Sequence, residues 1–205
     1  VDRLGDVTRI KMGREYQGRV LYWTAVYLVD GLLIDTGCAY TAEELAGFLK
    51  GRSLKLAVNT HHHEDHVGAN HLLQQRFGIP ILASRESTPL IEQRPALQPY
   101  QELVWGYPVP TEVSMVSDKV ETKGHLFSVI ETPGHCPGHL AIVEMSTGWC
   151  FSGDLFISKE PKAMRPDEDI YEIARSMKKL IDLETERLIL FTGLGNVVED
   201  GTGLH

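Results

Sequence analysis

Apolar and β-branched residues form short runs in the first third of the chain, and turn residues separate these runs. The runs predict strands at residues 8–12, 20–29, 32–35, 54–58 and 79–83. Asp30-Gly31 separates the second run from the third, and this dipeptide is typical of a tight hairpin turn. The chain therefore begins with antiparallel strands and continues into buried ones.

Helical spacing of apolar residues predicts two helices in the same half of the chain. The sequence from Thr41 to Glu44 has the pattern of a capping box, and the helix that follows ends at Gly51. A second helix is expected over 69–77, and Gly78 ends it.

The second half of the chain repeats this order of strands followed by a helix. Strands are predicted at 126–131, 140–145, 149–151 and 187–191. A long amphipathic helix is predicted over 166–182, with an apolar face of Ile170, Ile173, Ala174, Met177, Leu180 and Ile181. Two such halves predict an α/β fold in which two sheets form a sandwich with helices outside.

The segment from 84 to 111 follows neither pattern, because it contains five prolines. We expect a short helix followed by an irregular loop. The loop either covers a pocket or packs its aromatic residues on the body of the protein. If it covers a pocket, then Tyr100, Trp105 and Tyr107 are candidates for an apolar substrate wall.

Length and composition limit the class of protein. With 205 residues, 42% of them hydrophobic and 23% charged, the chain is expected to form a single domain over residues 1–205. No apolar run is long enough to span a membrane. A net charge of −8 argues against binding to a nucleic-acid backbone. Three cysteines in unrelated contexts favour a reducing cytoplasm.

Four of the nine histidines lie within residues 61–66, directly after a predicted buried strand. In an extended segment, His61, His63 and Asp65 point to one side, whereas His62 and Glu64 point away. His66 begins the next helix and turns back toward the same space. Imidazole and carboxylate groups are ligands of zinc, iron or manganese, so this segment predicts a metal site.

Two later segments present similar groups at strand ends. Residues 132–139 read Thr-Pro-Gly-His-Cys-Pro-Gly-His, and the glycines and prolines enforce a tight turn around His135. Ser152-Gly-Asp154 places a carboxylate after the strand at 149–151. The three segments in this order are far more specific than any one of them.

Together these segments resemble the metallo-β-lactamase superfamily, over nearly the whole chain. The sequence Leu-Ile-Asp-Thr-Gly at 33–37 is similar to the first motif of that family, in which the equivalent of Asp35 supports the metal loop. The resemblance implies a four-layer αβ/βα sandwich with the site at one edge between the sheets. It also implies a ligand set: His61, His63 and His135 for a first metal, and Asp65 and His66 for a second, with Asp154 bridging the two.

One position departs from the family pattern. The family places a last histidine for the second metal in a Gly-His-Gly turn after the final strand, but residues 192–195 read Thr-Gly-Leu-Gly. Leu194 cannot bind a metal, so the second site keeps three protein ligands and is expected to be weaker or partly occupied. We therefore expect one or two zinc ions, with iron or manganese as alternatives.

Such a metal pair predicts hydrolysis by a metal-bound hydroxide, with Asp65 orienting the water and passing its proton to the leaving group. A small ester, thioester or lactone is the expected substrate, because the pattern is nearest to the glyoxalase II branch. After Asp154, however, the chain lacks the Cys-Gly-Arg typical of glyoxalase II, which argues against a glutathione thioester in particular. A β-lactam is also disfavoured, because Asp154 stands where one major group of β-lactamases has a cysteine ligand.

Three alternatives to this function stay open. The first is phosphodiester or RNA hydrolysis, using basic residues at Lys159, Lys162, Arg165, Arg175, Lys178 and Lys179, although acidic neighbours at Asp167, Glu168, Asp169 and Glu172 favour an ordinary solvated helix face. The second is a mononuclear iron enzyme that activates oxygen or a persulfide, with the iron held by His61, His63 and either His135 or Asp154. The third is a metal-binding module with impaired turnover. The sequence leaves the oligomeric state open, a dimer included.

Overall fold

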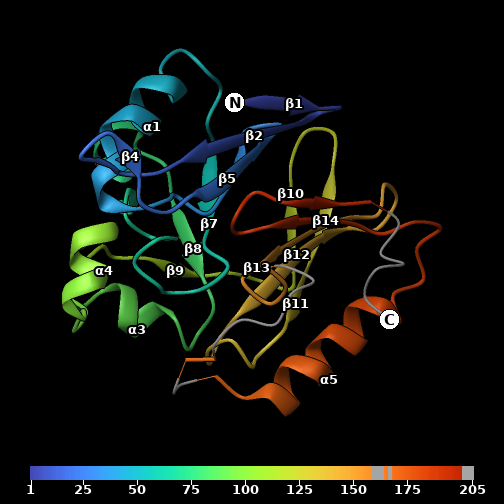
Figure 1. Ribbon diagram of the computed structural model, residues 1–205. Coiled ribbons are helices and arrows are strands. Elements are labelled where there is room, and N and C mark those ends of the chain that lie inside the picture. Colours follow the sequence, from blue (N-terminus) through green and yellow to red (C-terminus); the bar gives the residue numbers. More distant parts are fainter. Residues whose placement is uncertain (158–163, 166–167, 200–205) are drawn as a thin grey trace.

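The computed structural model of the chain describes residues 1–157, 164–165 and 168–199 and contains two large β-sheets (Figure 1). The first sheet has seven strands, in the spatial order β1 (Asp2–Leu4), β2 (Val7–Met12), β5 (Thr24–Val29), β6 (Leu32–Ile34), β7 (Leu56–Val58), β8 (Ile81–Ala83) and β9 (Ser114–Met115). The strands from β1 to β6 pair antiparallel, and those from β6 to β9 pair parallel.

The second sheet has six strands, in the spatial order β10 (Lys119–Glu121), β11 (Leu126–Glu131), β12 (Leu140–Glu144), β13 (Trp149–Gly153), β14 (Ile189–Thr192) and β15 (Val197–Val198). A small hairpin of β3 (Glu15–Tyr16) and β4 (Arg19–Val20) lies apart from both sheets. The helical elements are η1 (Ala39–Thr41), α1 (Ala42–Leu49), α2 (Asn70–Phe77), α3 (Thr88–Ile91), α4 (Pro99–Val104) and α5 (Ile170–Ile181).

Three separate layers of buried side chains define the architecture. One apolar cluster lies between the first sheet and α1 and α2, and includes Leu33, Leu45 and Leu73. A second, around Phe127 and Phe151, lies between the two sheets. A third joins the second sheet to α5, on the outer side of that sheet (Figure 1). Helix, sheet, sheet and helix thus form the four-layer αβ/βα sandwich expected from the sequence.

Several predicted elements are correct in type. The Asp30-Gly31 turn joins β5 to β6, and both of its residues have positive φ angles, 47° and 88°, as a hairpin turn of this type requires. Gly78 ends α2 in the left-handed conformation. The three cysteines, Cys38, Cys136 and Cys150, are all free and buried.

Other predictions for local structure are wrong. The run at 20–29 is not one strand, because the chain leaves β4 and enters β5 only at Thr24. No capping box forms at α1, because the Thr41 hydroxyl donates to the backbone oxygen of Cys38. The segment 84–111 contains two helices, α3 and α4, rather than one.

The helix predicted over 166–182 is shorter at its amino end, where residues 166–167 lie outside the described residues. Asp169 caps α5 by accepting from the backbone N–H groups of Tyr171 and Glu172. Of its predicted apolar face, Ile170 is 53% exposed, whereas Leu180 is buried and Ile173 and Met177 pack beside it. Ala174, also assigned to the apolar face, is exposed, so the prediction is correct for the later part of the stripe and wrong for Ile170 and Ala174.

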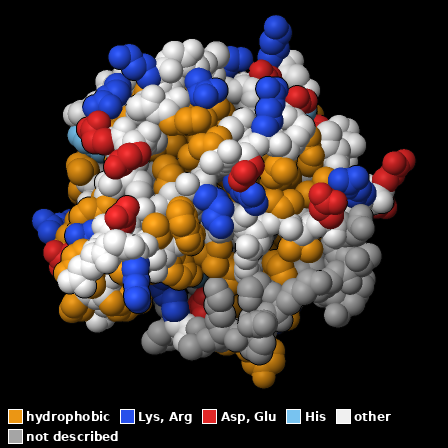
Figure 2. Space-filling model, turned by 45° about the horizontal axis from the view of Figure 1, so that its top comes forward, with side chains coloured by type: hydrophobic (Ala, Val, Ile, Leu, Met, Phe, Trp, Pro, Cys, Tyr) orange, Lys and Arg blue, Asp and Glu red, His pale blue; other side chains and the backbone are white. Residues whose placement is uncertain are grey.

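Among the residues that the structure describes, no helix combines the length and the apolar character needed to cross a membrane. Figure 2 shows lysine and arginine side chains interspersed with acidic ones over one face of the molecule, with apolar side chains between them.

Candidate metal centre

Three histidine nitrogens converge where loops from the two sheets meet. His61 and His63 follow β7, and His135 follows β11. His61 Nε2 lies 3.1 Å from His63 Nδ1, and His135 Nε2 lies 3.0 Å from that same atom. Nitrogens bound to one zinc ion at 2.0–2.1 Å in tetrahedral geometry lie about 3.3 Å apart. The structure therefore brings together the three histidines that the resemblance assigned to a first metal.

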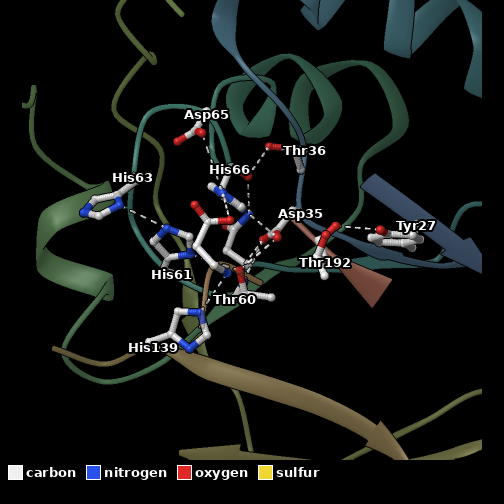
Figure 3. A network of polar contacts seen from close by, with 12 residues as sticks. Tyr27, Asp35, Thr36, Thr60, His61, His63, Asp65, His66, His139 and Thr192 are labelled. Carbon is white, nitrogen blue, oxygen red and sulfur yellow. Dashed lines mark hydrogen bonds and ion pairs between the residues drawn. The ribbon is translucent and has the colours of Figure 1, made fainter. Parts of the chain in front are cut away.

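The loop that carries His61 and His63 differs from the predicted extended segment. Residues 64–66 form a turn, and His66 lies in this turn, because α2 begins only at Asn70. Glu64 does not point to solvent. It is buried and accepts a hydrogen bond from Gln101 Nε2 at 2.7 Å. The turn still directs Asp65 and His66 toward His61 (Figure 3).

A second group consists of Asp65, His66 and Asp154, whose ligand atoms lie within 4.8 Å of one another. His66 Nε2 is 3.4 Å from Asp154 Oδ1 and 3.8 Å from Asp65 Oδ2. Asp154 Oδ2 is also 3.9 Å from His135 Nε2, so Asp154 lies between the two groups. Among the described residues, His66 Nε2 and Asp154 Oδ1 are buried without a hydrogen-bond partner. Buried orphan atoms of this kind fit a metal ion, which would satisfy both.

Hydrogen bonds on the outer side of the rings fix the tautomer of the histidines. Thr60 Oγ1 donates its only hydrogen to Asp35 Oδ2 at 2.8 Å, so toward His61 Nδ1, at 3.0 Å, it can only accept. His61 therefore carries its proton on Nδ1, and its Nε2 lone pair faces the cluster. His66 Nδ1 donates to Asp35 Oδ2 at 2.8 Å in the same way. Outer partners of this kind are typical of metal-binding histidines.

Asp35 occupies a strained position directly after β6. Its φ angle is +60°, an unusual value for a residue with a side chain. It is buried, and besides its bonds to His66 and the Thr60 hydroxyl it accepts from the Thr60 backbone N–H at 2.7 Å. The supporting role expected of this aspartate therefore has a direct geometric basis.

Glu168 supports the third histidine and was missed by the sequence analysis. Its Oε1 accepts from His135 Nδ1 at 2.7 Å, which leaves the His135 Nε2 lone pair facing His63. Glu168 comes from the segment before α5, 33 residues further along the chain, so no local pattern signals this pairing. We had assigned Glu168 to a solvated charged face, and that assignment is wrong.

His139 holds the backbone of Asp154 in place through a hydrogen bond. Its Nε2 accepts from the Asp154 backbone N–H at 3.2 Å, and its Nδ1 donates to Thr132 Oγ1 at 2.8 Å. Cys136 is buried with its sulfur within 4.8 Å of a His61 and a His63 nitrogen. Cys38, whose sulfur lies 3.5 Å from Thr41 Oγ1, packs near the start of α1.

Burial and neighbouring charges shift the pKa values of the clustered histidines in different directions. Burial lowers the pKa of His61 and of His63, and neighbouring imidazoles add to this effect. The lone pairs of both rings are therefore available at neutral pH. Burial opposes protonation of His66 as well, but Asp35, Asp65 and Asp154 outweigh it and raise the pKa of His66.

The pKa values of the two carboxyl groups in the second triad, on Asp65 and Asp154, are shifted in opposite directions. Burial raises the pKa of Asp65 to about 7, against the opposing effect of His66. Burial also acts to raise the pKa of Asp154, but the charge of His66, with smaller effects of His135 and His63, holds it below its ordinary value. Asp154 is thus an anion, whereas Asp65 can take up and release a proton near neutral pH.

The turn after β14 contacts the second triad, as the family pattern predicts. A Cβ atom built on Gly193 would lie 2.1 Å from Asp154 Oδ1 and 2.8 Å from His66 Cε1, so only glycine fits there. Leu194 follows it and is half-buried. Leu194, which stands where the family pattern has a histidine, is thus the next residue after the one that contacts the second triad, and its side chain has no ligand atom. His205 lies outside the described residues.

The predicted aromatic wall is only partly present. Tyr100 lines a cavity that also touches His63, but Trp105 and Tyr107 do not line it. Trp105 packs edge-on against Tyr22 with ring centroids 5.3 Å apart. Tyr107 lies under the Arg94 guanidinium, 4.1 Å from it.

The described basic residues of α5 make ordinary surface contacts. Arg175 pairs with Glu172, Lys178 pairs with Asp182, and Lys179 donates to the backbone oxygen of Glu131. These contacts agree with the solvated face that the sequence analysis favoured over a phosphate-binding one. Lys159, Lys162 and Asp167 lie outside the described residues.

Comparison with known proteins agrees with this geometry. The family model described as the metallo-beta-lactamase superfamily matches residues 24–192, and the chain therefore belongs to that superfamily. It is 29% identical to the hydroxyacylglutathione hydrolase GloC of Haemophilus influenzae, over 73% of this chain and 72% of GloC. It is 26% identical to the beta-lactamase-like protein 2 homolog of Drosophila melanogaster, over 94% of this chain but only 65% of the fly protein.

A solved structure shows the same architecture. The crystal structure of TTHA1623 in a di-iron-bound form superposes with a TM-score of 0.73 at 25% sequence identity, covering 95% of each chain. The chain is thus a member of a superfamily of metallo-hydrolases, with glyoxalase II-like relatives and groups of residues that can hold divalent metals.

Proposed function

We propose that this chain is a metal-dependent hydrolase of small carboxylic esters or thioesters. The observation that carries the proposal is that His61 Nε2 and His135 Nε2 lie 3.1 and 3.0 Å from His63 Nδ1, beside the triad of Asp65, His66 and Asp154. In this proposal the three histidines hold a first metal ion. Asp65 and His66 would hold a second, and Asp154, which lies between the two groups, would be available to both.

The donor set fits zinc, because imidazole and carboxylate ligands suit that ion. It also fits iron, and the structural relative with two iron ions supports this alternative. When bound, the ions supply a polarised carbonyl and an activated water. The reaction is hydrolysis: the acyl–oxygen or acyl–sulfur bond breaks, water gives its OH to the acyl carbon, and the remaining proton goes to the leaving group.

Within this reaction, Asp65 is the residue that moves the proton. Its carboxyl group lies in the second triad, 3.8 Å from His66 Nε2. A carboxylate in this position can orient water as a base and then protonate an alkoxide or thiolate leaving group. His139 and Glu168 bind no substrate in this proposal; they hold Asp154 and His135 in place.

Similarity to GloC supports an ester or thioester as substrate, since that relative is a hydroxyacylglutathione hydrolase. A lactone is an internal ester and belongs to the same chemistry.

The second triad predicts how many metal ions each chain binds. Because Leu194 supplies no ligand, we expect protein purified without added metal to contain one tightly bound ion per chain. Leu194→His should contain two. Elemental mass spectrometry measures both, and Asn196→His, an exposed position in the same turn, is the matched control that should remain at one.

Activity on a panel of p-nitrophenyl esters and thioesters should disappear with a chelator and return with zinc. It should rise in Leu194→His together with the second ion. If neither protein contained metal, the ligand assignment would be wrong. If both proteins contained metal but hydrolysed no ester or thioester, the ligand assignment would be supported and the proposed reaction would be wrong.

A further inference from the structure

A cavity of about 810 Å³ opens beside the candidate metal centre. Neither holding a metal ion nor orienting the ligands gives this cavity a role. One of its walls is the metal loop, with His62, His63 and Glu64, together with Arg165 from the segment before α5. Its other lining residues come from the segment that carries α3 and α4. Of the candidate metal ligands, His63 lines the cavity, so the cavity adjoins the candidate metal centre.

The wall formed by the segment of α3 and α4 presents both apolar and polar side chains to the cavity. Leu90 and Tyr100 are 45% and 54% exposed, and Pro95, Ala96 and Leu97 lie between them in the sequence. Apolar side chains that remain exposed beside a reactive centre favour binding of an apolar chain.

The charged groups of the cavity are unlike those of the whole chain. The chain has a net charge of −8, yet two arginines, Arg94 and Arg165, line this cavity. Its one lining carboxylate, Glu64, is buried and bonded to Gln101. The Arg94 guanidinium lies 4.1 Å from the centre of the Tyr107 ring, which restricts its orientation and leaves its edge to donate. Such a site favours an anion, and a planar carboxylate matches the guanidinium fork.

A buried hydrogen bond attaches this wall to the metal loop. Gln101 accepts from the Gln98 backbone N–H at 2.8 Å and donates to Glu64 at 2.7 Å. Glu64 lies in the chain between His63 and Asp65. The position of the cavity wall is therefore linked directly to the loop that presents the candidate ligands.

We propose that this cavity binds the acyl part of the substrate, and that the substrate is an ester or thioester with a carboxylate at the far end of an apolar acyl chain. The carboxylate pairs with Arg94 and lies in the field of Arg165, while Leu90, Leu97 and Tyr100 contact the chain. The inference rests on the proposed hydrolase function and specifies its substrate class.

Two matched substrates test this assignment with the zinc-loaded protein. Mono-p-nitrophenyl adipate carries the carboxylate, and p-nitrophenyl hexanoate has the same acyl length without it. We expect kcat/KM to be higher for the adipate ester, and Arg94→Gln to lower the ratio of the two values about tenfold, mainly through KM. Arg52→Gln is the control, because Arg52 lies over Phe48 at the same 4.1 Å but outside the cavity.

A binding measurement separates failure of this inference from failure of the hydrolase proposal. Monomethyl adipate is titrated calorimetrically into the chelator-treated protein, where turnover is not required. Binding that weakens in Arg94→Gln but not in Arg52→Gln supports the subsite, even if no ester is hydrolysed. Equal use of the two esters, with binding and kinetics indifferent to Arg94, would overturn the subsite and leave the hydrolase proposal intact.

Discussion

Three of the four candidate histidine ligands are oriented by a hydrogen bond on the side of the ring away from the cluster. Thr60 accepts from His61, Asp35 accepts from His66, and Glu168 accepts from His135. A neutral imidazole has one N–H and one lone pair, so an acceptor on the outer side directs the lone pair inward. The site thus depends on oxygen atoms that never touch the metal position.

Asp35 is the residue on which most of this orientation rests, and its removal gives a clear prediction. Asp35→Ala leaves the Thr60 N–H and the His66 ring without their buried acceptor. We expect a loss of about 3–5 kcal/mol in the free energy of unfolding, measured by urea denaturation with chelator present. Asp30→Ala is the matched control, because Asp30 also has a positive φ angle, +47°, but is exposed.

The control should lose the cost of placing alanine in a left-handed conformation, about 1–2 kcal/mol, and the exposed hydrogen bond that Asp30 accepts from the Gly124 N–H, about 1 kcal/mol or less. If the two variants lost equal stability, the backbone conformation rather than the buried carboxylate would be the main contribution of Asp35.

At this scale, the sequence predicted the groups that converge and the support from Asp35, but not the support from Glu168 and Gln101. His61, His63, Asp65 and His66 could be found because they all lie within residues 61–66, after one strand. The contacts of Glu168 with His135 and of Gln101 with Glu64 join segments more than 30 residues apart. Glutamate and glutamine occur on every protein surface, so such pairs become visible only in three dimensions.

Among the secondary-structure elements, the turn between β12 and β13 has a polar anchor of its own. Glu144, the last residue of β12, is buried and accepts from the hydroxyls of Ser146 and Thr147 and from the Thr147 backbone N–H. Burial alone would raise the pKa of Glu144, but these hydrogen bonds outweigh it, so the pKa is lower than the ordinary 4.5.

This lowered pKa makes the contribution of the turn dependent on pH. A carboxyl group with a lower pKa in the folded state stabilises the fold above its unfolded pKa, and the effect is lost as the pH falls through the folded value. The difference in unfolding free energy between the wild type and Glu144→Gln should therefore shrink from about pH 6 to about pH 3. Chemical denaturation across this range measures it, and a difference that did not change with pH would contradict the assignment.

Element boundaries were predicted less well than element types, and the errors have physical causes. Thr41 matches a capping-box pattern, but the turn of η1 before it offers the Cys38 carbonyl to its hydroxyl. The short edge strand β9 has only two residues, too few for any periodic signal. The prolines at 84–111 indicated a break in regular structure, although Pro89 and Pro99 lie in the first turns of α3 and α4, where proline is tolerated.

In the molecule as a whole, the candidate metal centre is the place where the two sheet halves supply groups to one site. His61, His63, Asp65 and His66 belong to the half that contains β7, whereas His135 and Asp154 follow strands of the second sheet. The halves already share an apolar core around Phe127 and Phe151. A metal ion bound by ligands from both halves would add a direct link between them at the edge of this core.

This arrangement predicts that metal binding stabilises the entire fold rather than one loop. A ligand present at 100 times its Kd stabilises the folded state by about 2.7 kcal/mol, which for a chain of this size raises Tm by about 5–10 °C. Differential scanning calorimetry with chelator and with buffered zinc measures the shift. His135→Ala should abolish most of it, because it removes the ligand from the second half, whereas His125→Ala, a histidine that packs on Trp149 away from the site, should retain it. A shift that survived in His135→Ala would show that zinc is held by the first half alone, and the link between the sheets would then be wrong.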